Sequence, residues 1–218
     1  MDLELTIDIF KNMLPALPRT FYITLVPFVL AFFLALVFTL VIYFKIPILQ
    51  NICKVFVSFF RGTPFIGQLF LIYFGLPKIL PALLDMGRVE AFILTMTLNT
   101  AAYVSESLRG AILAVDKGQI EAAKSIGLSN FLMMKNIVIP QAIPVAVPSL
   151  VNTLIDTIKG SSLAFSIGVV DITAMAQIQA GLTYQYFEAY MALVLLYWIV
   201  ILLLEFFQKK YEKKLKKG

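Results

Sequence analysis

The amino-acid sequence predicts an all-α, polytopic membrane protein with five transmembrane helices. Of the 218 residues, 60% are hydrophobic, and the mean hydropathy of the chain is +0.89. Soluble domains are closer to half apolar, so this composition argues against an ordinary globular fold. Long apolar runs alternate with short polar stretches, and about 20 apolar residues in a helix can cross a hydrocarbon core of ~30 Å.

The apolar runs place the five predicted spans within one membrane domain that covers residues 1–218. Residues 1–18 form an expected amphipathic lead-in, which we expect to end at Pro15 and Pro18. Residues 171–188 are expected to form a polar loop before the last span. The predicted spans cover residues 20–44, 55–76, 91–108, 140–168 and 189–207.

The loop between the third and fourth spans, residues 109–139, is too polar to cross a membrane. Charged residues such as Glu121 and Lys124 interrupt it, and one charge at mid-membrane costs about 2.5–3.5 kcal/mol on insertion scales. We expect a short helix that stops at Gly127, because glycine readily adopts the left-handed conformation found at helix ends. Pro140 suits the first turn of the next helix.

Lysine and arginine are distributed unevenly between the two sides of the predicted bundle. Twelve fall on the side of the 109–139 loop and four on the other side. The positive-inside rule then places the N-terminus outside and the loop and C-terminus in the cytoplasm. Membrane asymmetry therefore explains the net charge of +5 better than nucleic-acid binding does. The twelve are Lys45, Lys54, Arg109, Lys117, Lys124, Lys135 and six lysines in the last ten positions; the four are Lys11, Arg19, Lys78 and Arg88.

The composition also excludes several kinds of chemistry. The chain has no histidine and a single cysteine, Cys53, so histidine-based catalysis, histidine or cysteine-rich metal sites and an internal disulfide are excluded. No nucleotide-binding loop of the GxxxxGK[ST] type occurs in the sequence. We therefore predict no catalytic residue and no metal site, and any ATP-driven step requires another polypeptide.

Polar residues inside the predicted spans are the candidates for a substrate pathway. Asp156 and Lys159 are three positions apart and share one helix face. Two interpretations are open: the two charges neutralise each other, or their face lines a cavity where they meet the ammonium and carboxylate of an amino acid. In the second case Asn152, Thr153 and Ser162 extend the same polar wall.

The 109–139 loop resembles the EAA loop of ABC importer permeases. It contains Glu121-Ala122-Ala123, then Gly127, then Ile137, Ile139 and Pro140, and Ile139 alone departs from the family pattern, which has leucine there. The resemblance implies that Glu121, Ala122, Ala123 and Gly127 belong to a coupling helix that docks on a separate ATPase subunit. The alternative is an ordinary loop helix whose alanines pack on a neighbour.

Further segments are similar to the polar amino-acid uptake group of the same permeases. They are Arg61-Gly62-Thr63-Pro64, Gln68-Leu69-Phe70, Tyr73-Phe74-Gly75-Leu76-Pro77, Asn99-Thr100-Ala101-Ala102-Tyr103 and Ser161-Ser162-Leu163-Ala164. This similarity adds Arg61, Thr63, Asn99 and Tyr103 to the substrate-pathway candidates, although Arg61 fits a helix-to-helix hydrogen bond equally well. Glu106 and Arg109, again three apart, are expected to form a structural ion pair.

The resemblance implies a type I ABC importer transmembrane domain in a bacterial plasma membrane, working by alternating access. It implies ATPase subunits that use ATP and Mg²⁺, a second permease subunit of the same or a related chain, and an extracytoplasmic substrate-binding protein. No cofactor is expected on this chain. The alternative is an ATP-independent secondary carrier with proton coupling at Asp156 and Lys159; a membrane enzyme has little support, because the chain lacks catalytic groups.

The resemblance also bears on the substrate. Relatives that carry cationic amino acids have extra carboxylates in the cavity, and the matching positions here are Phe65, Thr153 and Gly160, none of which is acidic. Asp156 is then the one carboxylate expected in the cavity, with Arg61 and Lys159 nearby. We therefore expect a zwitterionic polar amino acid of the cystine or glutamine type.

Overall fold

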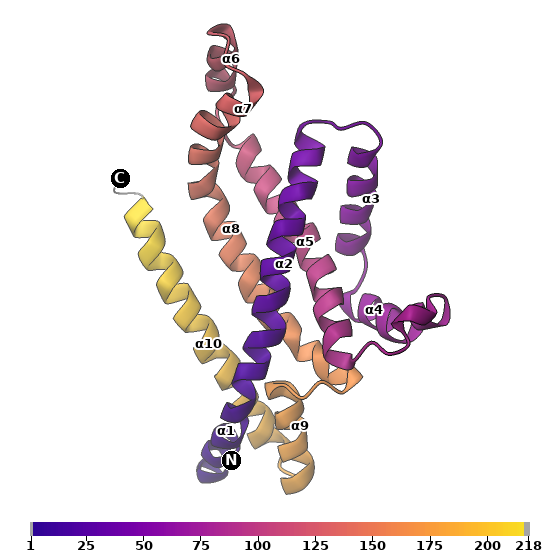
Figure 1. Cartoon of the computed structure of the whole chain (residues 1–218). Coiled ribbons are helices and arrows are strands. Elements are labelled where there is room, and N and C mark those ends of the chain that lie inside the picture. The colour runs from indigo at the N-terminus through magenta and orange to yellow at the C-terminus, as the bar shows by residue number, and fades with distance from the viewer. Residues whose placement is uncertain (1, 216–218) are drawn as a thin grey trace.

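The computed structural model describes residues 2–215, and side chains through residue 210. The described chain is helical and forms no strand, as the sequence predicts (Figure 1). Its α-helices are α1 (Leu3–Met13), α2 (Leu17–Tyr43), α3 (Leu49–Gly62), α4 (Phe65–Phe70), α5 (Arg88–Leu113), α6 (Lys117–Ser125), α7 (Asn130–Met133), α8 (Ile139–Gly160), α9 (Ile172–Thr183) and α10 (Tyr186–Leu215).

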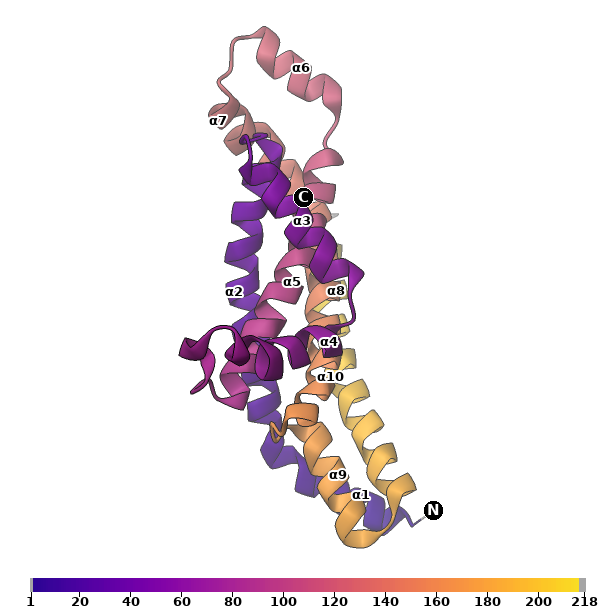
Figure 2. The ribbon, with the colours of Figure 1, turned by 90° about the vertical axis from the view of Figure 1, so that its right-hand side faces the viewer.

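The long helices α2, α5, α8 and α10 form an elongated bundle with α2 packed along α5 (Figures 1 and 2). α6 projects from one end of the bundle, and α1 and α9 lie at the other end with the N-terminus (Figure 2). The C-terminal end of α10 points toward the α6 end (Figure 1). This arrangement separates the projecting helix from the two short helices by the full length of the bundle.

Small residues let α2 and α5 approach closely. Ala31 and Ala35 of α2 and Ala101 and Ala102 of α5 are fully buried, and small side chains allow close backbone contact between helices in a membrane. Thr39 on α2 adds a polar link, because its hydroxyl donates to the carbonyl of Ala35 at 2.7 Å and reaches the carbonyl of Ser105 on α5 at 3.3 Å. The α2–α5 pair is therefore the central packed pair of helices in the bundle.

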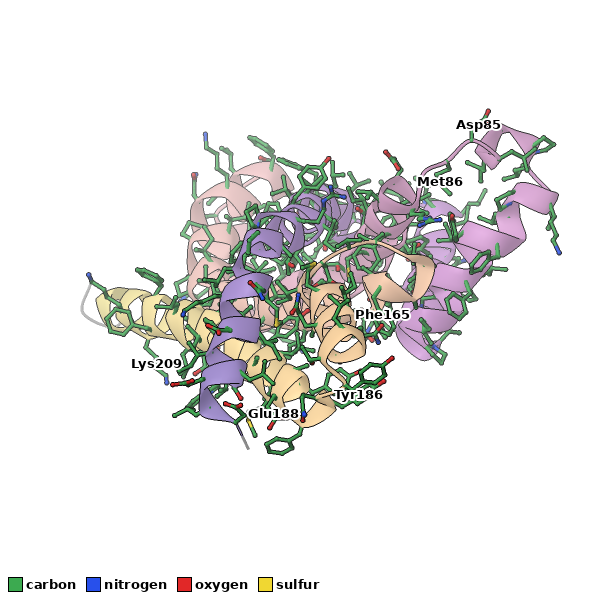
Figure 3. The ribbon with its side chains drawn as sticks, turned by 90° about the horizontal axis from the view of Figure 1, so that it is seen from below. Asp85, Met86, Phe165, Tyr186, Glu188 and Lys209 are labelled. Atoms are coloured by element: carbon green, nitrogen blue, oxygen red, sulfur yellow. The ribbon has the colours of Figure 1, made fainter. Side chains whose placement is uncertain are left out.

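The N-terminal segment continues into the first span instead of ending at its prolines. A single 3-10 turn, Leu14–Ala16, joins α1 to α2, and together they form one helical stretch of 41 residues, Leu3–Tyr43, that contains an apolar segment long enough to cross a membrane. Pro15 and Pro18 lie in the first turns of their elements, where no N–H is needed for a helical hydrogen bond. At the start of α1, the Asp2 N–H donates to the carboxylate of buried Glu188 at 3.0 Å. Glu188 lies in the first turn of α10 and is labelled in Figure 3.

The predicted second span, residues 55–76, is a bent pair of helices and not a single helix. α3 ends at Gly62, and α4 and the turns that follow it leave at 111° to α3. Pro64 has no N–H to donate, and it holds the preceding Thr63 in an extended conformation (φ −123°, ψ 150°). The chain therefore breaks at residues 63–64, and α4 crosses the end of α5 instead of continuing α3.

Three stretches of the described chain are long and apolar enough to cross a membrane, and the bent α3–α4 pair is a fourth candidate. α5 is equally long but more polar, and it does not meet the same criterion. The expected polar loop at 171–188 instead contains the helix α9, because Asp171 caps its N-terminus. The three stretches are Leu3–Tyr43, Asn130–Ile167 and Tyr186–Lys210.

Candidate functional site

A cavity of about 270 Å³ lies between α5 and α8, and Phe65 at the start of α4 contributes to its wall. Ligand sites are typically concave, with apolar walls and a few polar groups, and this cavity has that composition at a size suited to a small molecule. The walls come from helix positions three or four apart, which face one side. The lining residues are Phe65, Met96, Asn99, Thr100, Tyr103, Thr153, Asp156, Thr157, Gly160 and Leu163.

Asp156 and Lys159 form an ion pair, with Nζ of the lysine 3.0 Å from Oδ1 of the aspartate. Both side chains are largely exposed in the isolated chain, and exposed pairs contribute little to stability. Asp156 also lines the cavity, whereas Lys159 lies outside the lining. The two charges are thus paired with each other, as the first interpretation from the sequence expects. Asp156 nevertheless lies in the cavity wall, as the second interpretation, a charged face that lines a cavity, requires.

Two other candidates, Thr63 and Asn99, hold the chain break in place. The Asn99 amide donates to the carbonyl of Phe60 at 3.2 Å and to Oε1 of Gln68 at 2.9 Å. The Gln68 amide in turn donates to the hydroxyl of Thr63 at 2.8 Å and to the carbonyl of Phe60 at 2.9 Å. This network replaces backbone hydrogen bonds lost at the break, and it fixes α3 and α4 against α5.

Gln68 lies in a segment that resembles the family, but it is not among the predicted site residues. Its side chain is 3% exposed, and a buried amide needs partners for its donors and its acceptor. The available signal was a lone polar residue in the apolar run Phe65–Phe70. Thr100 and Thr157 were also missed, although their 3.4 Å hydroxyl contact joins α5 to α8 at the cavity wall.

Asn152 and Ser162 lie outside the cavity. Asn152 is exposed on α8, and Ser162 is half-buried in the 3-10 segment Ser161–Ile167 that follows α8. Its neighbour Ser161 is the buried one, with its hydroxyl 3.2 Å from the hydroxyl of Tyr197 on α10. Neither residue therefore extends the wall of this cavity, and for Ser162 the reason is that the chain tightens into a 3-10 segment after Gly160.

A second cavity, of about 420 Å³, continues from the first along the same two helices. Tyr103 and Thr153 line both cavities. Ser149 donates to Ser107 across the second cavity at 2.8 Å, which links α8 to α5. Its lining residues are Arg61, Tyr103, Glu106, Ser107, Gly110, Ala111, Val145, Ser149 and Thr153.

Arg61 contacts α5 through charge and through an aromatic ring. The predicted pair of Glu106 and Arg109 is present and bidentate, with N–O distances of 3.0 and 2.6 Å. Arg61 joins it, with Nη1 3.5 Å from Glu106 Oε2. The Arg61 guanidinium carbon also lies 5.7 Å from the centre of the Tyr103 ring, within cation–π range. Arg61 therefore has a helix-to-helix role and also lines the second cavity.

The EAA segment forms α6, and the predicted stop at Gly127 is confirmed. The Asp116 carboxylate caps the start of α6 by accepting the Gln119 N–H at 3.2 Å. Gly127 has φ +76°. Its N–H donates to the carbonyl of Lys124 at 2.9 Å, and the N–H of Leu128 donates to the carbonyl of Ala123 at 3.1 Å. This is the Schellman pattern, in which a left-handed glycine satisfies the last helix carbonyls.

One face of α6 is packed and the other is free. Ala123 is 2% exposed and packs with Val115, Met133 and Val138. Glu121 and Ala122 are exposed, and the apolar side chain of Ile126 next to them is 77% exposed. Ala123 thus packs on its neighbours, as expected for an ordinary loop helix, while Glu121, Ala122 and Ile126 form an exposed surface on α6. Contiguous exposed apolar residues often mark protein–protein contacts.

A bundle of long apolar helices with a polar cavity and a helix projecting from one end is the architecture of a membrane permease subunit. Residues 28–217 match the family described as binding-protein-dependent transport system inner membrane component, and the chain belongs to this family.

Individual proteins agree with this assignment over their full lengths. The chain is 37% identical to the probable amino-acid permease protein YxeN of Bacillus subtilis (strain 168), covering 100% of this chain and 97% of the relative. It is also 37% identical to the L-cystine transport system permease protein TcyL of the same organism, covering 100% and 92%. The crystal structure of an amino acid ABC transporter with histidines superposes with a TM-score of 0.91 at 29% identity, covering 98% of this chain and 99% of that one.

These findings confirm the predicted fold and class. The chain has the fold of a type I ABC importer transmembrane subunit and is an ABC permease subunit of a multi-pass membrane protein family. The ATP-independent secondary carrier has no support among these relatives.

Proposed function

We propose that this chain translocates a polar amino acid by alternating access, driven by separate ATPase subunits. The observation that carries the proposal is the cavity between α5 and α8, with the carboxylate of Asp156 in its wall. An ionisable residue within a membrane-spanning helix usually faces a partner, a cavity or a polar ligand. The names of the relatives, an amino-acid permease and an L-cystine permease, support the same substrate class.

A zwitterionic substrate, of the cystine or glutamine type, fits the charges of the cavity. Asp156 is the one carboxylate among the described lining residues, and it can accept the single α-ammonium group. Phe65, Thr153 and Gly160 also line the cavity and offer no second carboxylate for a cationic side chain. Lys159, paired with Asp156 at 3.0 Å, supplies a cation close by for the α-carboxylate.

The proposed coupling surface is the exposed side of α6, formed by Glu121, Ala122 and the turn at Gly127. An ATPase subunit that binds this surface moves α6, and the motion passes to the bundle through two routes. One is the short link from α6 back to α5 at Leu113. The other is the packing of Ala123 on Met133, which precedes α8. ATP and Mg²⁺ are used by the ATPase, because this chain lacks a GxxxxGK[ST] loop.

The proposed orientation places α6 and the C-terminus in the cytoplasm and the N-terminus outside a bacterial plasma membrane. The crossings are α2 with α1, the bent α3–α4 pair, α5, α8 with the segment after it, and α10. Support comes from charge: Lys45, Lys54 and the lysine-rich end of α10 lie toward the α6 end of the bundle (Figure 1). An extracytoplasmic binding protein then delivers substrate at the α1–α9 end.

A second permease subunit, identical or related, completes the proposed assembly. In the isolated chain Asp156, Tyr103 and Arg61 are all exposed on one side although they line cavities. Ionisable groups at membrane depth are expected to face protein or water rather than lipid. A partner subunit over this side would enclose them and close the pathway.

Uptake by the reconstituted transporter tests the proposal. The permease, its ATPase and its binding protein are placed in proteoliposomes, and ATP-driven import of radiolabelled cystine and glutamine is measured with arginine as competitor. We expect import of a zwitterion with little competition by arginine. Import blocked by arginine or lysine alone would contradict the substrate class, and import that needs a proton gradient but no ATP would contradict the function.

The coupling surface is tested in the same preparation by charge reversal. Glu121→Arg is expected to reduce import and co-purification of the ATPase, because it inverts the charge of the exposed α6 face. Glu4→Arg is the matched control, since it makes the same change on exposed α1 at the opposite end of the bundle. Equal import by the two variants would argue against α6 as the coupling surface.

A further inference from the structure

The two cavities between α5 and α8 share two lining residues and follow one another along the helices. The helices run antiparallel, and the lining positions succeed one another turn by turn from Met96 to Gly110 on α5 and from Gly160 to Val145 on α8. Tyr103 and Thr153 belong to both linings, so they stand opposite each other where the two cavities meet.

The path continues from the second cavity toward the α6 end of the bundle. A cavity of about 410 Å³ shares Arg61 and Glu106 with the second cavity and adds Lys54 and Arg109 to the walls. A further cavity of about 360 Å³ shares Lys54 and Arg109 and reaches Lys45 in the turn after α2. A solute that moves from the Asp156 cavity into the second cavity passes the two residues common to both, Tyr103 and Thr153.

Charge and ring contacts hold the Tyr103 side chain at this junction. The ring is 41% exposed, so apolar packing alone does not fix it. The Arg61 guanidinium lies 5.7 Å from the ring centre. Glu106 Oε2 forms an ion pair with Arg61 Nη1 at 3.5 Å, and Glu106 is itself fixed by two hydrogen bonds from Arg109. The ring is therefore braced by a relay of three charged side chains from α3 and α5.

We propose that Tyr103 is the gate residue between the substrate cavity and the path toward the α6 end, and that Arg61 and Glu106 position its ring. The proposal rests on the proposed function, because it takes the Asp156 cavity to hold the amino acid. Thr153, the opposing residue, is small, so displacement of one aromatic ring is enough to open the junction.

The relay also connects the gate to the proposed coupling helix. Arg109 lies in the last turns of α5, which ends at Leu113, and α6 begins four residues later at Lys117. A movement of α6 that displaces the end of α5 carries Arg109 with it and changes its bidentate hold on Glu106. Without that hold Glu106 is no longer fixed in place, so the Glu106–Arg61 pair can move as a unit and the Arg61 guanidinium can leave its position beside the Tyr103 ring.

Passive flux measures the gate separately from transport. Proteoliposomes with the complete transporter are loaded with the radiolabelled amino acid that the wild type imports, and efflux is followed without ATP. We expect Tyr103→Ala to raise passive efflux by about tenfold or more, equivalent to a barrier lowered by about 1.4 kcal/mol. Tyr103→Phe keeps the ring and its Arg61 contact, so its efflux is expected to stay within about twofold of wild type.

Arg61→Gln provides a second variant that keeps the tyrosine and removes its brace. It is expected to raise passive efflux to a value between those of wild type and Tyr103→Ala. Tyr22→Ala is the control, because Tyr22 is an exposed aromatic residue on α2 outside all the cavities described above. If Tyr103→Ala fails to assemble, efflux through the Arg61→Gln transporter decides the question.

The outcomes separate the gate from the function on which it rests. If the wild type imports an amino acid with ATP but neither variant leaks more than Tyr22→Ala, the gate is refuted and the proposed function stands. If the variants import more slowly without any leak, Tyr103 has a structural or binding role, and the gate is again refuted. If the wild type imports no amino acid, the proposed function itself fails.

Discussion

The buried carboxylate of Asp171 makes the stability of the folded chain depend on pH. Asp171 is 0% exposed and caps α9, with Oδ1 accepting the N–H groups of Thr173 at 3.0 Å and Ala174 at 2.9 Å. Its other oxygen, Oδ2, is buried without a hydrogen-bond partner, and no described cation forms an ion pair with it. Burial therefore dominates and raises the pKa of Asp171 from 3.8 to about 6.

The sign of the effect follows from proton linkage. The folded chain binds the Asp171 proton more tightly than the unfolded chain does, so the stabilising contribution is fully present below pH 3.8 and is lost as pH rises through about 6. A difference of about 2.2 pKa units corresponds to an upper limit of about 3 kcal/mol lost above that range. The pKa of about 6 already includes the capping hydrogen bonds, which lower the pKa and offset part of the effect of burial.

Asp171→Asn tests this reasoning, because asparagine caps a helix as well as aspartate does and carries no charge. We expect the variant to be more stable than wild type at pH 8, by roughly 1–3 kcal/mol, and the gain to shrink by pH 4.5. The assay is thermal unfolding of the purified permease in detergent between these pH values. For a chain of this size each kcal/mol moves Tm by about 2–4 °C.

Asp116→Asn is the matched control, since Asp116 caps α6 in the same way but is exposed. The two residues differ in burial, so the control is expected to change Tm by less than about 1–2 °C at both pH values. A gain at pH 8 that equals the gain at pH 4.5, or a loss of stability at pH 8, would refute the assignment of a buried, uncompensated carboxylate to position 171.

Three further substitutions test individual features by thermal unfolding. In Gly127→Ala the added methyl group meets no atom within 4 Å, but alanine must adopt φ +76°, so the variant should destabilise the folded chain by about 1–2 kcal/mol. Gly181 is equally open but lies within helix α9, so Gly181→Ala should stabilise the folded chain by about 0.5–1 kcal/mol. Gln68→Leu should destabilise by about 1–3 kcal/mol, because its partners at the chain break lose their hydrogen bonds. Ala123→Leu should destabilise the folded chain by about 1–3 kcal/mol through overpacking, and the same change at exposed Ala122 should be near neutral. Equal effects of the two glycine substitutions would contradict the left-handed conformation of Gly127, and equal effects of the two alanine substitutions would contradict the burial of Ala123.

Local patterns were predictable from the sequence alone. The apolar runs indicated an all-α membrane protein, and the Glu121–Gly127 motif predicted a short helix with a glycine stop. The ion pairs Glu106–Arg109 and Asp156–Lys159 also follow from sequence, because residues three apart are neighbours on any helix. Each of these predictions depends on chain segments of a few residues, where helix geometry leaves little choice.

Contacts between distant segments were decided by the tertiary structure. Pro64 indicated an awkward span, but the 111° bend and its attachment to α5 depend on Gln68 meeting Asn99, which lies 31 positions away. The junction of Tyr103 with Thr153, and the brace from Arg61, likewise require α3, α5 and α8 to pack side by side. Helix periodicity shows which residues share a face, whereas the partner of that face is set by how small and bulky side chains fit between helices, and this information is spread over the whole chain.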